Sequence, residues 1–210
     1  MRQINNEITI SVQKLISSYK MLYKATALML ILFAAFLFTG CMKNDKERLE
    51  DNSKVSNEKK QTDDLFKAYQ NTGLSGATLL ELQQVKDATA KYHTLDNAFR
   101  DGYADIGLKL PNMGYHMLKS ELVKTTFNLE KPAILVYNKK DNGEFELVAV
   151  EYAVPIDWSD PHTPPAGFTG DQDEWNFNTL NTGWWTLHAW VWQFNPDGVF
   201  KPMNPDVIVK

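Results

Sequence analysis

The stretch Glu144-Phe-Glu-Leu-Val-Ala-Val-Glu-Tyr-Ala-Val154 decides the fold, because its long apolar run is typical of a buried β-strand. Pro155 ends this strand. Just before it, Ala133-Ile-Leu-Val-Tyr137 predicts a second strand. The loop 138–143 between them ends in Asn-Gly, which supplies the positive φ angles of a tight turn. The two strands are therefore predicted to form an antiparallel hairpin.

A helix and a third strand complete the predicted architecture. Between Thr78 and Arg100 apolar residues recur at three- and four-residue steps, which predicts one long helix that Gly102 terminates. The segment 184–194 predicts the third strand. A helix followed by antiparallel strands indicates an α+β domain, with the long helix packed on one face of the sheet. The residues expected on the buried helix face are Leu79, Leu82, Val85, Tyr92, Leu95 and Phe99.

A long loop is predicted over residues 157–183, where Pro, Gly, Asp and Asn are frequent. Loops of this length are uncommon inside a compact domain and are often functional. We therefore expect a pocket between the sheet and this loop, with Tyr115, Trp184 and Trp190 as its aromatic walls. The competing interpretation is that the six tryptophans, all between residues 158 and 192, belong to the core.

The N-terminal part of the chain has the pattern of an export signal. The apolar segment 25–38 follows Lys20 and Lys24, and it is shorter than the roughly 20 residues that a bilayer-spanning helix needs. Residues 1–40 are therefore predicted to be a signal peptide, with Met1 and Met21 as the two candidate starts. The alternative is an uncleaved membrane helix.

Cys41, the only cysteine, directly follows this segment. The stretch Leu37-Phe-Thr-Gly-Cys41 resembles the lipobox of bacterial lipoproteins, although leucine is commoner than phenylalanine at the position of Phe38. The resemblance implies cleavage before Cys41 and a lipid such as palmitate on its side chain. It thereby implies a protein anchored to a bacterial membrane and facing outside the cytoplasm.

The remainder of the chain divides into a tether and one domain. Residues 41–63 are almost entirely polar and cannot offset the entropy of ordering, so they are predicted to be a disordered, lipidated tether. Residues 64–210 are long enough for a single globular domain with one core. With Cys41 modified, no disulfide can form within the chain.

The net charge argues against nucleic acid as a partner. The full chain has a net charge of −4, and residues 1–40 carry four basic side chains and one acidic side chain, a net +3. The remainder therefore has a net charge of −7. An acidic domain without a cluster of Lys and Arg does not attract a polyanion.

Two ionisable residues interrupt the apolar strands. Strand alternation predicts Glu151 on one face with Leu147, Ala149 and Ala153. In the third strand it predicts a shared face for Trp184, Thr186, His188, Trp190 and Trp192. Buried ionisable groups are costly unless they are paired, so Glu151 and His188 are expected to meet. His116, from a turn with aromatic neighbours, is expected to complete the cluster.

Two histidines and a carboxylate are a common ligand set for zinc, iron or a similar divalent metal. The plainer interpretation also stays open: Glu151 would face solvent and the histidines would be hydrogen-bonded structural residues. No HExxH segment, nucleophile elbow or phosphate loop is present. The favoured function is a non-enzymatic domain that binds a small ligand or metal. The alternatives are a metal-dependent enzyme that uses His116, Glu151 and His188, and a structural protein of the cell envelope.

Several segments together resemble an exported bacterial domain family of unassigned function. They are Ala88–His93, Met113–His116, Val148–Pro155, Leu187–Trp190 and Asn195–Phe200. The resemblance covers roughly residues 88–206 and implies that the two histidines and the glutamate belong to the family pattern. It implies no known activity.

Overall fold

The computed structural model describes residues 64–209. The predicted signal peptide (1–40), Cys41 and the predicted tether (41–63) lie outside the described residues. Among residues 64–209, no helix combines the length and the apolar character needed to cross a membrane.

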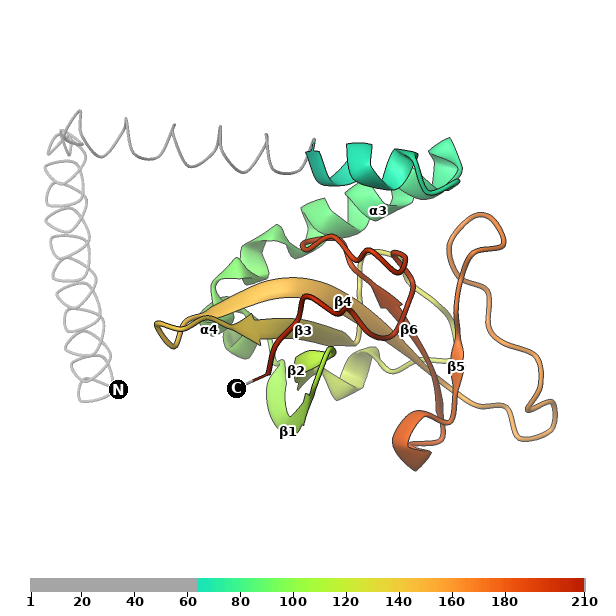
Figure 1. The fold of residues 1–210 in the computed structure, drawn as a ribbon. Coiled ribbons are helices and arrows are strands. Elements are labelled where there is room, and N and C mark those ends of the chain that lie inside the picture. Colours follow the sequence, from blue (N-terminus) through green and yellow to red (C-terminus); the bar gives the residue numbers. More distant parts are fainter. Residues whose placement is uncertain (1–63, 210) are drawn as a thin grey trace, which may run out of the picture. The chain divides into compact units, whose positions relative to one another are not determined.

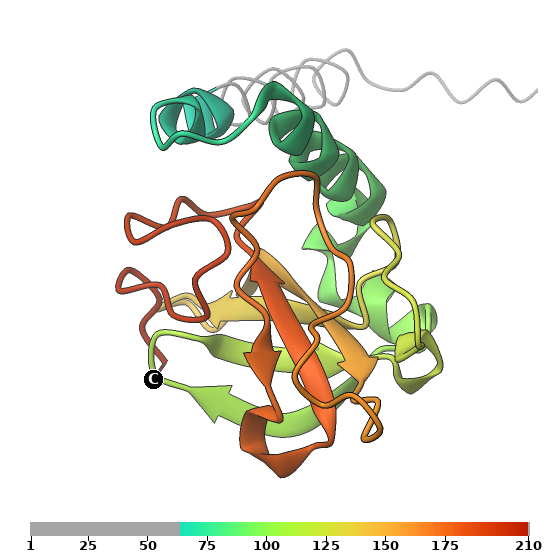
Figure 2. The ribbon, with the colours of Figure 1, turned by 90° about the vertical axis from the view of Figure 1, so that its right-hand side faces the viewer.

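A six-stranded antiparallel sheet forms the centre of the domain, with strand order β1-β2-β3-β4-β6-β5 (Figure 1). The strands are β1 Ala104–Leu110, β2 Gly114–Leu118, β3 Ile134–Lys139, β4 Phe145–Pro155, β5 Asn176–Phe177 and β6 Trp184–Ala189. The helical segment 76–100 lies along one side of this sheet (Figures 1 and 2). This arrangement confirms the predicted α+β class.

Residues 64–70 are helical, and after a short turn the chain enters α3, Gly76–Thr89. The Ser75 hydroxyl caps α3 by accepting a hydrogen bond from the Thr78 N–H. The 3₁₀ segment η1 (Ala90–His93) and the short helix α4 (Leu95–Arg100) follow.

The prediction of one unbroken helix to Arg100 is wrong, because the backbone is extended at Thr94, with φ −88° and ψ 109°. The Tyr137 hydroxyl donates a hydrogen bond of 2.6 Å to the Tyr92 carbonyl, which a continuous helix would have used internally. The break turns Phe99 away from the sheet, where 44% of it is exposed.

The core on the helix side of the sheet is large. It joins apolar residues of α3, including Leu82 and Val85, to residues that alternate along the strands, such as Leu135, Tyr152 and Leu187. Tyr69 links this core to the C-terminal part of the chain. Its hydroxyl donates to the Trp190 carbonyl and accepts from the Asn195 N–H.

The opposite face of the sheet has a smaller core, made of Ala133, Ile134, Val136, Val148, Ala149, Ala153, Trp190 and Val207. The C-terminal segment packs here. Its Val207 carbonyl accepts from the Asn112 N–H, and its Lys201 carbonyl accepts from the Trp190 indole N–H. Both faces of the central strands are therefore buried.

A β-bulge in β4 corrects the predicted side-chain faces. Val136 pairs with Ala149 but Tyr137 pairs with Leu147, so Val148 is the additional residue. The additional residue interrupts the alternation of side chains between the two faces of β4. Leu147 lies in the core on the helix side, whereas Val148 and Ala149 both lie in the opposite core. The prediction that Leu147 shares a face with Glu151 is therefore wrong.

The third predicted strand is shorter than expected. It ends at Ala189, because the Trp190 N–H donates to the Val199 carbonyl and the Trp192 N–H donates to the Val148 carbonyl. The chain bends there, so Trp192 packs in the helix-side core and not on the face of His188.

Two other predicted loops contain strands. The segment around His116, predicted as a turn, is the hairpin of β1 and β2. The predicted loop 157–183 contains β5 and the 3₁₀ segment η3, Thr179–Asn181. The remaining 3₁₀ segment, η2, covers Ser120–Leu122.

Candidate metal centre

The sheet brings together three ionisable side chains from three strands. Glu151 of β4 and His188 of β6 are directly paired in the register. His116 lies on β2, which β3 separates from β4, and it pairs with Val136 of β3. All three side chains point to the face opposite the helices, because their strand neighbours on that face belong to the smaller core.

The three side chains are close to one another and shielded from solvent. Oε2 of Glu151 lies 3.8 Å from Nε2 of His116, and Oε1 of Glu151 lies 3.6 Å from Nδ1 of His188. One donor atom from each residue lies within 4.8 Å of the other two. The exposed fractions are 1% for His116, 4% for Glu151 and 0% for His188.

Most hydrogen-bonding capacity of the two imidazoles is unused. Nδ1 of His116 donates to the Leu108 carbonyl at 3.3 Å. Within residues 64–209, four buried side-chain polar atoms lack a hydrogen-bond partner, and three of them are Nε2 of His116 and both ring nitrogens of His188. A buried polar atom without a partner costs about 1–3 kcal/mol, so such a concentration at one place requires a physical reason.

Burial favours the uncharged form of each group. It lowers the pKa of His116, although the nearby Glu151 carboxylate acts in the opposite direction. It lowers the pKa of His188 to about 4. Burial also raises the pKa of Glu151, against the smaller effects of His116 and of the Thr186 hydroxyl. The imidazoles are therefore neutral, which is the form that binds metals.

The donor set suits one metal ion, and its spacing is somewhat wider than that of a bound site. Two donors bound at about 2.0–2.2 Å and at a tetrahedral angle lie about 3.4 Å apart. The separations of 3.6 and 3.8 Å are longer than a good hydrogen bond, and they involve different oxygens of Glu151. One donor atom from each of the three residues lies within 4.8 Å of the other two, so the side chains would have to move slightly closer together to bind one ion. A cation among the three would stabilise the Glu151 carboxylate and accept the free lone pairs of both histidines.

The three aromatic residues predicted to line a pocket do not come together. Trp190 is completely buried, and its ring is stacked near that of His188, with centroids 6.1 Å apart and an angle of 15°. Trp184 is half-buried and packs against the same small core. Tyr115 lies on the other face of the sheet, in edge contact with Phe145. Strand alternation separates Tyr115 from His116, so the predicted pocket is wrong in this respect.

Cavities occur elsewhere in the described domain. Residues 171–174 of the long loop line a cavity of 390 Å³ together with residues 196–201, where Lys201 and Glu174 form an ion pair. A second cavity, of 560 Å³, lies between helical residues 64–68 and the segment 192–194. Neither is lined by any of the candidate ligands. The cluster is enclosed because its three side chains are almost completely buried, and it lines neither of these two cavities.

Sequence reasoning missed the Leu108 carbonyl, and it placed Thr186 on the face of His188 without connecting it with Glu151. The Leu108 carbonyl carries no side-chain signal, because any residue at that position would present the same atom. Thr186 flanks Glu151 on β6 and shares a hydrogen bond of 2.9 Å with Thr179. The available signal was Gly107, directly before Leu108, because a glycine permits an unusual backbone turn, and its φ angle here is 68°.

Comparison of the chain with protein-family models, with curated proteins and with solved structures found no match. The resemblance to an exported bacterial family therefore stays a prediction. What the site can do follows from its own residues and their geometry.

Proposed function

We propose that this chain is an exported lipoprotein, anchored through a lipid on Cys41, whose domain binds a divalent metal ion through His116, Glu151 and His188. The observation that carries the proposal is the concentration of unpartnered, buried imidazole nitrogens around a buried carboxylate. The export signal and the lipobox resemblance support the location.

The metal explains a cluster that would otherwise be unfavourable. Among residues 64–209, Glu151 has no ion pair with a lysine or arginine, and its only cationic candidates are the two histidines. Burial keeps those histidines neutral, so they do not supply the missing charge. Burial raises the pKa of Glu151, so keeping this acid ionised costs free energy without a counter-charge, and a bound cation would remove that cost.

The donor set also narrows the class of ion. Two imidazoles and one carboxylate suit zinc, cobalt or ferrous iron. Calcium and magnesium prefer oxygen ligands, often with several waters, and a dry site with two nitrogens is unsuitable for them. We therefore expect a transition metal or zinc.

One feature favours a metal-dependent enzyme as the second candidate. Three protein ligands, with a further position for water or substrate, are typical of catalytic zinc sites, whereas structural zinc sites have four. The enclosed position of the ligands favours the binding role instead. Azide added to the cobalt-loaded protein distinguishes the two. A change in the visible absorption of Co²⁺ would indicate an accessible position, as an enzyme requires.

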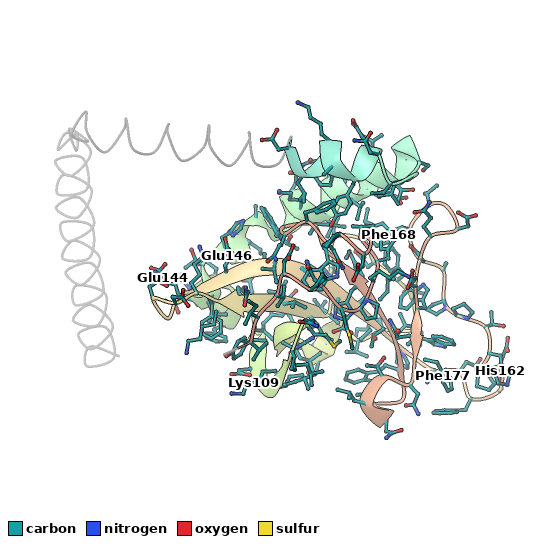
Figure 3. All side chains as sticks on the ribbon, in the orientation of Figure 1. Lys109, Glu144, Glu146, His162, Phe168 and Phe177 are labelled. Carbon is teal, nitrogen blue, oxygen red and sulfur yellow. The ribbon has the colours of Figure 1, made fainter. Side chains whose placement is uncertain are left out.

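The main test is the metal content of the full chain purified from membranes in detergent. We expect close to one ion per chain, lost in His188→Ala and in Glu151→Gln. The second variant keeps the size and shape of the side chain, so a loss of metal there is not explained by misfolding. His162→Ala is the matched control, because His162 is exposed in the outer loop, away from the centre of the sheet (Figure 3).

Two results would contradict the proposal. Metal that persists in Glu151→Gln but disappears in His162→Ala would place binding on a surface histidine. A folded wild type that takes up no ion, even after incubation with Zn²⁺, Co²⁺ or Fe²⁺, would leave a small-ligand domain as the better account.

A further inference from the structure

We propose that the bulge of β1, residues 105–109, orients His116 for metal binding, with the Leu108 carbonyl as the positioning group. This inference rests on the proposed metal site and adds a group that controls its affinity without touching the ion. Three observations support it: the register of the β1–β2 hairpin, the hydrogen bond to His116 and the conformation of Gly107.

The register brings a backbone carbonyl onto the imidazole. The β1–β2 pairing is regular on either side of the bulge, between Asp105 and Met117 and between Lys109 and Tyr115. Between these pairs β1 has three residues, 106–108, whereas β2 has only His116. The additional length lets the Leu108 carbonyl reach Nδ1 of the imidazole at 3.3 Å.

This hydrogen bond, together with a backbone hydrogen bond to Gly114, favours one tautomer of the His116 ring and so decides which ring nitrogen can bind a metal. A carbonyl oxygen can only accept, so Nδ1 of His116 carries the hydrogen. The lone pair is then on Nε2, which faces Oε2 of Glu151 at 3.8 Å. The other tautomer would place a hydrogen on Nε2 and block it as a ligand. Hydrogen bonds of this kind orient metal-binding histidines in many proteins.

A local turn, and not core packing, maintains the bulge. The Gly107 N–H donates to Oδ1 of Asp105 at 2.8 Å, and the φ angle of Gly107 is 68°. Residues 104–107 are exposed, so neighbouring side chains hold them only weakly. A side chain at position 107 would meet no atom within 4 Å, and its whole effect would be strain in the backbone.

The chain offers a matched control for that strain. Gly143 has a φ angle of 88°, and a side chain there would likewise meet no atom within 4 Å. It lies in the β3–β4 turn beside Glu144, at the tip of that hairpin (Figure 3). Gly107→Ala and Gly143→Ala therefore impose similar backbone strain, but only the first acts on the bulge that contacts His116.

The experiment is a Co²⁺ titration of the full chain, followed by visible absorption, with Zn²⁺ competition for the affinity. We expect Gly107→Ala to bind Co²⁺ about 10–100-fold more weakly and to show a shifted absorption spectrum, because the His116 ring is misoriented. Gly143→Ala should keep both the affinity and the spectrum of the wild type. Asp105→Asn retains a carbonyl oxygen for the Gly107 N–H and should bind normally, whereas Asp105→Ala should resemble Gly107→Ala.

The outcomes separate this inference from the proposed function. If the wild type binds Co²⁺ and Gly107→Ala matches it in affinity and spectrum, the positioning role is wrong and the metal site stands. If both glycine variants lose affinity equally, the effect is general destabilisation and the inference is also overturned. If the folded wild type binds no Co²⁺ or Zn²⁺, the metal site itself is wrong.

Discussion

Glu151 is a buried acid whose pKa is raised by burial, so its ionised form is costly when no cation is present. We predict that Glu151→Gln, measured by urea unfolding at neutral pH with a chelator present, raises the free energy of unfolding by about 1 kcal/mol. Burial raises the pKa of Glu151, so either ionising or protonating this acid at neutral pH costs free energy that a neutral amide avoids. With saturating Zn²⁺ the wild type should be more stable than Glu151→Gln, because only the wild type gains the binding energy of the metal.

Glu146→Gln is the control for this prediction, because Glu146 is also on β4 but is 42% exposed and pairs with Lys140 at 3.3 Å. Glu146→Gln should change the free energy of unfolding by less than about 1 kcal/mol, both with the chelator and with saturating Zn²⁺. If Glu151→Gln destabilised the protein equally with and without metal, the cluster would instead be a hydrogen-bonded structural triad.

Asp173 is a second residue with a testable charge, at a distance from the candidate metal centre. Burial raises its pKa to about 6, although the Phe168 N–H donates to its carboxylate at 2.8 Å and opposes the shift. An acid with a higher pKa in the folded state than in the unfolded state contributes stability at low pH, and that contribution is lost as the pH rises through 6.

We therefore predict that the wild type loses stability relative to Asp173→Asn between about pH 4 and pH 7. Urea unfolding at a series of pH values measures this difference. Asp171→Asn is the control, because Asp171 is exposed on the same loop. Parallel pH profiles for the wild type and Asp173→Asn would show that the Asp173 carboxyl is not buried as described.

At the scale of elements, α3 is held to the sheet by its buried face. Val85 is completely buried in the helix-side core, whereas Leu80 on the same helix is 68% exposed. We predict that Val85→Asp lowers the free energy of unfolding by about 3–5 kcal/mol, because it places an unpaired charge in the core. Leu80→Asp should stay within about 0.5 kcal/mol of the wild type. Thermal unfolding checks both, and a Val85→Asp variant that melts like the wild type would show that α3 packs through another face.

At the scale of the whole molecule, the proposed anchor and the domain should be separable. We predict that Cys41→Ala blocks lipid attachment and processing, so the variant keeps its precursor size, larger than that of the processed wild type, and does not incorporate labelled palmitate. Thermal unfolding of the domain should not change, because Cys41 precedes its first described residue. A variant that has the same size as the wild type and the same palmitate labelling would contradict the lipoprotein proposal.

The sequence by itself determined the α+β class, the β3–β4 hairpin and the chemistry of the candidate ligands. These features depend on local patterns: apolar runs, the Asn-Gly turn, and ionisable residues within apolar strands. The pairing of Glu151 with His188 was also within reach, because both residues lie in strands that the pattern predicts.

Only the tertiary structure decided which side chains share a face of the sheet and where the helix is interrupted. The bulge at Val148 depends on the partner strand β3, and the break at Thr94 depends on a hydroxyl from Tyr137, which is distant in sequence. The position of His116 on β2, away from Tyr115, likewise follows from pairing with β3. The Leu108 carbonyl became a candidate positioning group only through the hairpin register. Strand pairing and backbone hydrogen bonds join residues far apart in the chain, so side-chain periodicity alone does not reveal them.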